Sequence, residues 1–262
     1  MDSTQSGAEN VERRGLQAIV LAGGKGTRMR SDLPKVLHDL RGRSVIRHAI
    51  DNLREAGIDD VIVVIGHGGD LVKEHLEGGV RFAVQERQLG TGHAVRQALP
   101  LLEETTGSVF ICYGDMPFLH PATIRALIDT GSQPDVAGAI LTMVLDDPPD
   151  FGRVIRDEHA QVRRVVEVKD CTPEELGIKE FNVGVYCFDA EALRWALPRL
   201  RDDNAQGEYY LTDLVQILTE GGRRVETVRT ENLEDTVGVN DRADLKFAER
   251  LKDTSRSKPS RR

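Results

Sequence analysis

A cluster of glycines and basic residues, LAGGKGTRMRSDLPK at 21–35, carries the strongest chemical signature in the sequence. It follows QAIVL at 17–21, a short apolar run that predicts a buried strand. The glycines allow the backbone to approach a ligand closely, and successive N–H groups can bind phosphate oxygens. Four cations accompany them in a chain of net charge −8, namely Lys25, Arg28, Arg30 and Lys35. This local reversal of charge predicts a polyphosphate ligand.

Two common phosphate-binding motifs do not fit this loop. A P-loop needs a glycine five positions before the Gly24-Lys25 pair, where Ile19 stands. A dinucleotide-binding motif needs a glycine three positions after Gly26, where Met29 stands. The loop is therefore of another kind, unless it is only a glycine-rich turn with solvated basic side chains.

A second segment, QERQLGTGHA at 85–94, joins a predicted strand to a predicted helix. Its Gly90-Thr91-Gly92 sequence can turn the backbone tightly at the start of the helix. Gln85 carries an amide that both donates and accepts hydrogen bonds, which suits the edge of a uracil or a cytosine. On the residues alone, the segment indicates either a base-binding loop or an ordinary capped helix start.

Asp115 lies in YGDMP at 113–117, where another predicted strand ends. Ligands of open α/β sheets bind at the carboxyl ends of the strands. A lone carboxylate there suits Mg²⁺, which keeps several waters and takes further oxygens from phosphates. The alternative is an aspartate that caps a turn.

Alternating strands and helices are predicted to carry these segments. In the first half we expect strands at 17–21, 60–66, 81–85 and 108–115, and helices at 44–57, 70–77, 91–104 and 121–131. Pro100 is expected to kink the third of these helices. The second half is richer in strands, at 137–147, 164–170, 180–189 and 223–229, with helices near 189–199, 207–220 and 240–252. The alternation predicts an α/β fold with a mainly parallel sheet.

Composition excludes several classes of protein. The chain has 262 residues, 39% hydrophobic and 30% charged, which fits one globular domain with an elaborated second half. No apolar run is long enough to span a membrane and the first residues form no signal peptide. Three distant cysteines form no C-x-x-C pair, so we expect a reduced, cytoplasmic protein. His38, His48, His67 and His93 lack zinc spacing and are expected to pack or hydrogen-bond.

The charge is unevenly distributed. The last eleven residues, 252–262, contain five Lys/Arg and one Asp, so the rest of the chain is more acidic than the total. An acidic body does not favour nucleic acid as a partner. We expect residues 1–15 to be a disordered leader and 252–262 a disordered basic tail, with the domain at 16–251.

The pattern L-x-G-G-x-G-T-R-M-x-x-x-x-P-K resembles the opening of the sugar-nucleotide pyrophosphorylases. Q-L-G-T-G-H-A is similar to one branch, the uridylyltransferase domain of the bacterial bifunctional N-acetylglucosamine-1-phosphate uridylyltransferase/glucosamine-1-phosphate acetyltransferases. The resemblance implies a Rossmann-like, three-layer nucleotidyltransferase fold, a mainly parallel mixed sheet with helices on both faces. It also implies transfer of a uridylyl group from UTP to N-acetylglucosamine 1-phosphate, for the synthesis of cell-envelope (peptidoglycan) precursors. This sequence contains no hexapeptide repeats of the acetyltransferase kind, and whether it is free-standing or one domain of a longer protein stays open.

The resemblance also implies roles for individual residues. The nucleotide would be bound by Leu21, Ala22, Gly23, Gly24, Lys35, Gln85, Gly90 and Thr91, and catalysis would rest on Arg28, Lys35 and Lys25. Mg²⁺ would be held by Asp115 and by Asn240 in VGVN. The sugar would contact Gly152, Glu167, Asn182, Tyr210 and Thr212. Two departures from the family pattern concern the sugar: Val183 replaces a small hydroxyl residue, and EVKD replaces a segment that often contains histidine. Gly23 stands where relatives commonly have alanine, a change that we expect the turn to accept.

Three alternatives remain open at this point. A related nucleotidyltransferase could use another sugar 1-phosphate or another nucleoside triphosphate. A sugar-nucleotide-dependent glycosyltransferase would usually carry a D-x-D pair, whereas YGDMP has one aspartate. A non-catalytic sugar-nucleotide-binding protein would be expected to lose the loop cations or Asp115, and all are present.

Overall fold

The computed structural model describes residues 15–24, 26–29, 31 and 33–256. Lys25 and Arg30, to which the sequence assigns a role in phosphate binding, lie outside the described residues. So do residues 1–14 of the predicted leader and residues 257–262 of the predicted tail.

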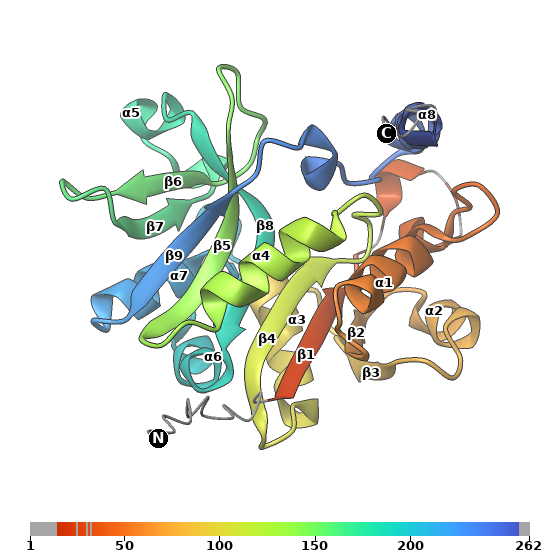
Figure 1. Ribbon diagram of the computed structural model, residues 1–262, viewed down its shortest axis with the longest axis horizontal. Helices are drawn as coiled ribbons and strands as arrows, with labels where there is room; N and C mark the ends of the chain where they lie inside the picture. Colours follow the sequence, from red (N-terminus) through yellow and green to blue (C-terminus); the bar gives the residue numbers. More distant parts are fainter. Residues whose placement is uncertain (1–14, 25, 30, 32, 257–262) are drawn as a thin grey trace, which may run out of the picture.

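One mixed sheet forms the centre of the molecule (Figure 1). Its main path runs in the order β3-β2-β1-β4-β8-β5-β9. The first four of these strands are parallel to one another, β8 is antiparallel to both of its neighbours, and β5 is parallel to β9. The described strands are β1 (Gly15–Leu21), β2 (Asp60–Ile65), β3 (Arg81–Val84), β4 (Thr106–Tyr113), β5 (Val136–Val144), β6 (Arg153–Arg156), β7 (Val162–Val166), β8 (Glu180–Asp189) and β9 (Arg224–Arg229).

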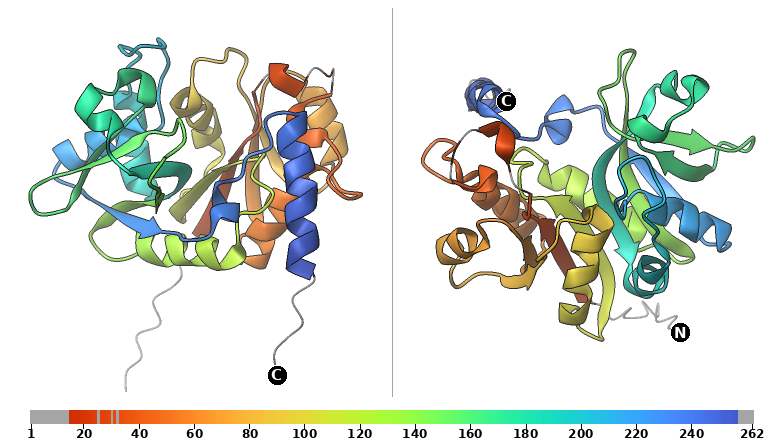
Figure 2. Two further views of the ribbon diagram at one scale, coloured as in Figure 1. Left: turned by 90° about the horizontal axis from the view of Figure 1, so that it is seen from above. Right: turned by 180° about the vertical axis from the view of Figure 1, so that it is seen from behind.

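Helices cover both faces of this sheet, as predicted (Figures 1 and 2). Side chains of β1 alternate between two buried clusters, with Ala18 and Val20 on one face and Ile19 and Leu21 on the other. The first face is covered by α1 (Val45–Glu55), α2 (Gly69–His75) and α4 (Pro121–Gly131). The second face is covered by α3 (Thr91–Ala98), α6 (Ala190–Ala196) and α7 (Asp213–Glu220). The three-layer α/β fold predicted from the sequence is confirmed.

Several predicted boundaries were wrong. The helix expected over 91–104 ends at Ala98 and continues as a 3-10 turn over Leu99–Leu101, because Pro100 cannot donate a backbone hydrogen bond. The helix expected from 207 begins only at Asp213. The strand expected over 164–170 is β7, which ends at Val166. Neither the four-residue strand β6 nor the four-residue helix α5 (Pro173–Leu176) was predicted.

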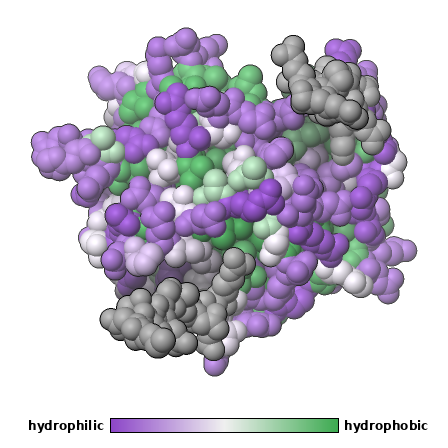
Figure 3. Space-filling model, in the orientation of Figure 1, coloured by the Kyte–Doolittle hydropathy of each residue, from purple (hydrophilic) through white to green (hydrophobic). Residues whose placement is uncertain are grey.

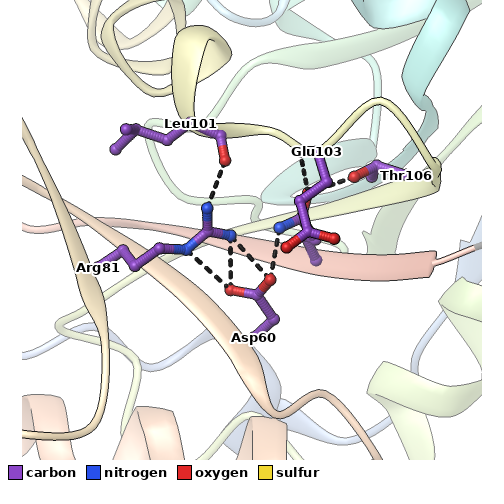
Figure 4. Close-up of polar contacts among 6 residues, drawn as sticks. Asp60, Arg81, Leu101, Glu103 and Thr106 are labelled. Carbon is purple, nitrogen blue, oxygen red and sulfur yellow. Dashed lines mark hydrogen bonds and ion pairs between the residues drawn. The ribbon is translucent and has the colours of Figure 1, made fainter.

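The amino-terminal edge of the sheet is held by a polar network that joins β1, β2, β3 and β4 (Figure 4). Arg81 forms a bidentate ion pair with Asp60, at 2.7 and 2.8 Å from Nη2 to the two carboxylate oxygens. Gln17 donates to the same carboxylate, and its Oε1 accepts from the backbone N–H of Glu103 at 2.9 Å and from the hydroxyl of Thr106. This network fixes the positions of the four strands relative to one another along their axes. It therefore also fixes the positions of the loops at their carboxyl ends.

The C-terminal helix α8 (Arg242–Arg256) packs beside the loop that precedes α1 (Figure 2). Ala248 of α8 shares a small buried cluster with Leu40, Val45 and Val239. This packing brings residues 238–241 to the sheet edge at which β1 and β4 end. Among the described residues, none of the helices has the length and apolar character needed to cross a bilayer. The face shown in Figure 3 is mostly hydrophilic, with hydrophobic side chains near its centre.

Candidate active site

The predicted site loops meet at the carboxyl edge of the four parallel strands. The N–H of Ala22 donates to Val64 at 2.8 Å, and the N–H of Gly114 donates to Leu21 at 2.9 Å. The N–H of Gln85 donates to the carbonyl of Ile65 at 2.8 Å. These backbone bonds lie just beyond the strand ends, so they hold the loops after β1, β3 and β4 in fixed relative positions.

Lys35 and the two predicted metal ligands form one polar cluster. The Lys35 ammonium donates to Oδ2 of Asp115 and, at 3.0 Å, to Oδ1 of Asn240. Asp115 is buried, with a relative exposure of 6%. The N–H of Val239 donates to the carbonyl of Asp115 at 2.8 Å, which brings Asn240 beside the carboxylate. The structure therefore unites residues that stand 80 and 205 positions apart in the chain.

The oxygen atoms of Asp115 and Asn240 in this cluster suit a hard divalent cation. A carboxylate oxygen of Asp115 and the amide oxygen of Asn240 already converge on one positive group. Magnesium prefers such oxygen ligands and completes its shell with water and phosphate. Within the part of the chain that the structure describes, no three His, Cys, Asp or Glu side chains form a self-sufficient metal site.

The glycine loop directly follows the carboxyl end of β1. Gly26 has φ +56°, a left-handed conformation that favours glycine, and the Lys35 side chain lies against it. Gly23 has no such backbone requirement, but a Cβ built there would lie 3.3 Å from Oε1 of Gln85 and from the N of Gly66. The turn thus accepts alanine only if these neighbours yield by a few tenths of an ångström, a tighter fit than the sequence indicated. Arg28 is exposed in the 3-10 turn Thr27–Met29.

The predicted base-binding loop is held from two sides. The amide nitrogen of the buried Gln85 donates to the carbonyl of Gly90 at 3.0 Å. Gly90 has φ +109°, and a Cβ there would come within 2.6 Å of the Tyr209 carbonyl. The hydroxyl of Thr91 accepts from the N–H of Leu211 at 3.0 Å. Only glycine fits at position 90, where the two segments approach each other. This contact connects the base-binding loop to residues 209–212.

Four of the five predicted sugar-binding positions lie close together at the mouth of the β6–β7 hairpin. The Thr212 hydroxyl donates to Oε1 of Glu167 at 2.9 Å. The N–H of Asn182 donates to the carbonyl of Gly152 at 2.8 Å, and a Cβ built on Gly152 would lie 3.7 Å from the Glu167 carboxyl carbon. Oδ1 of Asn182 is buried and has no hydrogen-bond partner. A buried acceptor of this kind calls for a donor such as a sugar hydroxyl.

The fifth position, Tyr210, is buried two residues before Thr212. Its hydroxyl accepts a hydrogen bond from Nε2 of Gln206 at 2.8 Å. Val183, one of the two departures from the family pattern, is buried in the core cluster with Phe181 and Val185. Its replacement of a hydroxyl residue therefore bears on packing of the core.

Two carboxyl groups near the predicted sugar site have raised pKa values. Burial raises the pKa of Glu167, while the hydrogen bond from Thr212 opposes that rise. Burial, with the negative charges of Glu167, Asp170 and Asp203, raises the pKa of Asp213 to about 6. This end of the site therefore disfavours further negative charge, which suits a neutral sugar ring better than a phosphate.

Sequence reasoning missed two residues that contact the predicted site. His93 was expected only to pack or to hydrogen-bond, and its Nδ1 lies 3.0 Å from Nε2 of Gln85. The hydroxyl of Tyr186, four residues after Asn182 on β8, accepts from Nδ2 of Asn182 at 2.8 Å. The position of His93 directly after Gly90-Thr91-Gly92 was the one available signal, since the start of a helix presents its side chains to the preceding loop.

A cleft lies away from these residues. This cleft, of about 1450 Å³, opens at the amino-terminal edge of the sheet and is lined by Gly15, Asp60, Ser108, Arg125 and Arg224 among others. None of the predicted site residues lines it. Because no residue with a predicted role lines this cleft, the candidate active site is the one at the carboxyl edge.

The fold is that of a nucleotidyltransferase. The crystal structure of a putative glucose-1-phosphate thymidylyltransferase from Bacillus anthracis, in complex with a sucrose, superposes with a TM-score of 0.74. The match covers 95% of this chain and 98% of that chain at 21% sequence identity. A family model for the MobA-like NTP transferase domain matches residues 18–164. The chain belongs to the family of MobA-like NTP transferase domains.

Curated relatives share a larger part of the sequence. The bifunctional protein GlmU of Brevibacillus brevis is 44% identical over 234 residues, which are 89% of this chain and 51% of that protein. The bifunctional protein GlmU of Clostridium perfringens is 46% identical over 235 residues, with the same coverage. The chain thus spans about half the length of the curated relatives it matches. The resemblance to nucleotidyltransferases that the sequence motifs indicated is confirmed.

Proposed function

We propose that this protein transfers a uridylyl group from UTP to N-acetylglucosamine 1-phosphate, yielding UDP-N-acetylglucosamine and pyrophosphate. The observation that carries the proposal is the convergence of Lys35, Asp115 and Asn240 beside the glycine loop. A cation site between a triphosphate loop and a sugar pocket is what this reaction requires. Its product would serve cell-envelope precursor synthesis, a cytoplasmic process.

The chemistry requires no side-chain base. The phosphate of the sugar has a second pKa near ~6, so its oxygen is already a dianionic nucleophile at neutral pH. That oxygen would attack the α-phosphorus of UTP, and the bond from this phosphorus to the oxygen bridging to the β-phosphate would break, releasing pyrophosphate. The obstacle is repulsion between two anions, so positioning and charge neutralisation supply the catalysis.

Three basic residues of the glycine loop would then divide two tasks. Arg28, exposed beside the loop, would bind the departing pyrophosphate together with Lys25. Lys35 would leave its contacts with Asp115 and Asn240 and hold a phosphate oxygen. Asp115 and Asn240 would hold Mg²⁺, which, when bound, neutralises charge on the nucleotide and on the sugar phosphate.

Base and sugar would be bound by two separate sets of residues. Gln85, Gly90 and Thr91 would bind the uracil, and the Leu21–Gly24 segment would bind the nucleotide along the end of β1. Glu167, Asn182, Thr212, Tyr210 and the backbone of Gly152 would contact the N-acetylglucosamine. The buried, unpartnered Oδ1 of Asn182 supports a hydrogen-bonding sugar at that position.

The proposal is tested by identifying the product. The protein would be incubated with UTP, N-acetylglucosamine 1-phosphate and Mg²⁺, and the mixture analysed by mass spectrometry for UDP-N-acetylglucosamine. The Asp115→Ala variant should react at least about a hundredfold more slowly than the wild type. Asp235→Asn would not be a suitable control for it, because Asp235 is fully buried. The exposed Asp202→Asn serves as the control instead. Failure of the wild-type protein to form this product would overturn the proposal.

A further inference from the structure

The side-chain amide of Gln85 has one defined orientation. Its Nε2 lies 3.0 Å from the carbonyl oxygen of Gly90 and 3.0 Å from Nδ1 of His93. A carbonyl oxygen can only accept, so the amide group that faces Gly90 must be the NH₂. Both amide hydrogens are then used, one for Gly90 and one for His93. Nδ1 of His93 must therefore accept, which puts the proton of the neutral ring on Nε2.

This orientation aims the oxygen of Gln85 at the glycine loop. A Cβ built on Gly23 would lie 3.3 Å from Oε1 of Gln85, so the oxygen faces the loop that follows β1. The residue is 4% exposed, and its backbone N–H is bonded to Ile65. Oε1 is thus a fixed acceptor on the side of the site where the nucleotide is expected.

His93 is itself held in place on α3. The centroid of its ring lies 6.3 Å from that of Tyr209. The guanidinium of Arg96 lies over the same Tyr209 ring, 4.9 Å from its centroid. Burial lowers the pKa of His93, and the charges of Arg96 and Arg87 lower it further. The ring is therefore neutral at physiological pH and keeps a free lone pair for Gln85. The Gln97 amide lies 3.3 Å from the other ring nitrogen and can turn its oxygen toward that N–H.

We propose that His93 is a positioning residue that sets the choice of base, because it holds the Gln85 oxygen as an acceptor and so selects uracil over cytosine. Uracil presents an N–H at the position where cytosine presents a bare acceptor. The inference rests on the proposed function, in which Gln85 contacts the base. A free amide could rotate to suit either base, and the contacts of Gln85 with Gly90 and His93 remove that freedom.

Rotation of the amide would leave two groups badly matched. Oε1 would face the Gly90 carbonyl, acceptor against acceptor, and the His93 lone pair would lose its donor. We therefore expect the wild-type protein to prefer UTP over CTP by at least about tenfold in kcat/KM, as one mispaired buried group requires. Gln85→Ala should weaken the use of UTP without creating use of CTP.

The test compares UTP with CTP in variants at position 93. His93→Ala should lower the UTP/CTP ratio of kcat/KM by about fivefold or more, mainly through a higher KM for UTP. A variant that only loosened the fold would slow both nucleotides equally and leave the ratio unchanged. His93→Asn can place an amide oxygen close to the former Nδ1 and should restore most of the ratio. Glu104→Gln, exposed beyond the end of α3, is the control and should leave the ratio within about twofold.

An independent measurement needs no variant to be active. The tautomer of His93 can be read from the nitrogen chemical shifts of the ring in the wild-type protein, with the signal assigned from His93→Asn. The inference expects the proton on Nε2. A proton on Nδ1, or a ratio unaffected by His93→Ala, would overturn it. If the wild-type protein does not use UTP at all, the proposed function itself fails, so the two failures are distinguishable.

Discussion

The ammonium group of Lys35 donates a hydrogen bond to the carboxylate of Asp115, 80 residues further along the chain. The same ammonium lies 3.0 Å from Oδ1 of Asn240, so one lysine satisfies both predicted metal ligands. A cation already held between two oxygens competes with any other cation for them. Lys35 and Mg²⁺ would therefore exclude each other, and nucleotide phosphates would release the lysine by offering it another partner.

Lys35→Met should strengthen metal binding in the absence of nucleotide. Removing the competing ammonium leaves Asp115 and Asn240 free for the divalent ion, and we expect affinity for Mn²⁺ to rise by about fivefold to tenfold. The concentration of free Mn²⁺ can be measured by electron paramagnetic resonance. The wild-type protein should bind weakly alone and more strongly with UTP. Lys73→Met, at the exposed end of α2, provides the control. Weaker binding by Lys35→Met would show that the lysine supports the site instead.

Arg28→Ala should lower kcat far more than it raises KM for the sugar phosphate. The charge on the leaving pyrophosphate develops in the transition state, so its partner acts on kcat. A loss of about a hundredfold is expected for Arg28→Ala, and Arg28→Lys should recover part of it because the charge remains. Steady-state kinetics with both substrates varied measures this. An unchanged kcat would remove Arg28 from the mechanism.

Thr212→Val and Glu167→Gln should impair binding of the sugar phosphate. Thr212 donates to Glu167 at 2.9 Å, and either change disturbs the pair that faces the predicted sugar pocket. We expect KM for N-acetylglucosamine 1-phosphate to rise by about tenfold, with KM for UTP within about twofold. Glu174→Gln, exposed on α5, is the matched control. Equal effects on both substrates would place this pair outside the sugar pocket.

Asp213→Asn should stabilise the protein at alkaline pH. The pKa of Asp213 is raised from 3.8 to about 6 in the folded state, chiefly by burial. Ionisation of its carboxyl group above pH 6 therefore lowers the free energy of unfolding. The wild type loses stability as the pH rises from about 4 to 6. Asparagine has no such cost, so a gain of about 1 kcal/mol is expected at pH 8, discounted for partial exposure, and little gain at pH 4. Urea denaturation at both pH values measures the difference; a gain equal at both would exclude ionisation as its cause.

Local pattern was sufficient for most of the sheet and for the loops at its carboxyl edge. QAIVL and SVFICY are apolar runs bounded by glycine, so their strands and the segments after them were predictable from the residues. The short elements β6 and α5 were not, because four residues carry too little periodicity to distinguish a strand or a helix from a turn.

Contacts between distant residues needed information beyond local pattern. Asn240 was assigned to the metal site only through family resemblance, since its approach to Asp115 depends on the packing of α8 against Leu40 and Val45. Glu167 and Asn182 would pass in the sequence as ordinary strand and turn positions. The contact of His93 with Gln85 depends on how the loop between β3 and α3 folds back on the first turn of the helix, which no spacing in the sequence records.

Release of pyrophosphate across a grid of substrates tests the central claim most directly. The grid pairs UTP, CTP, ATP and GTP with N-acetylglucosamine 1-phosphate, glucose 1-phosphate and galactose 1-phosphate, each with Mg²⁺ and after its removal by a chelator. The account predicts that UTP with N-acetylglucosamine 1-phosphate gives the highest kcat/KM by at least about tenfold, and that the chelator abolishes it. A higher kcat/KM for another pair, or no release from any pair, would contradict the account.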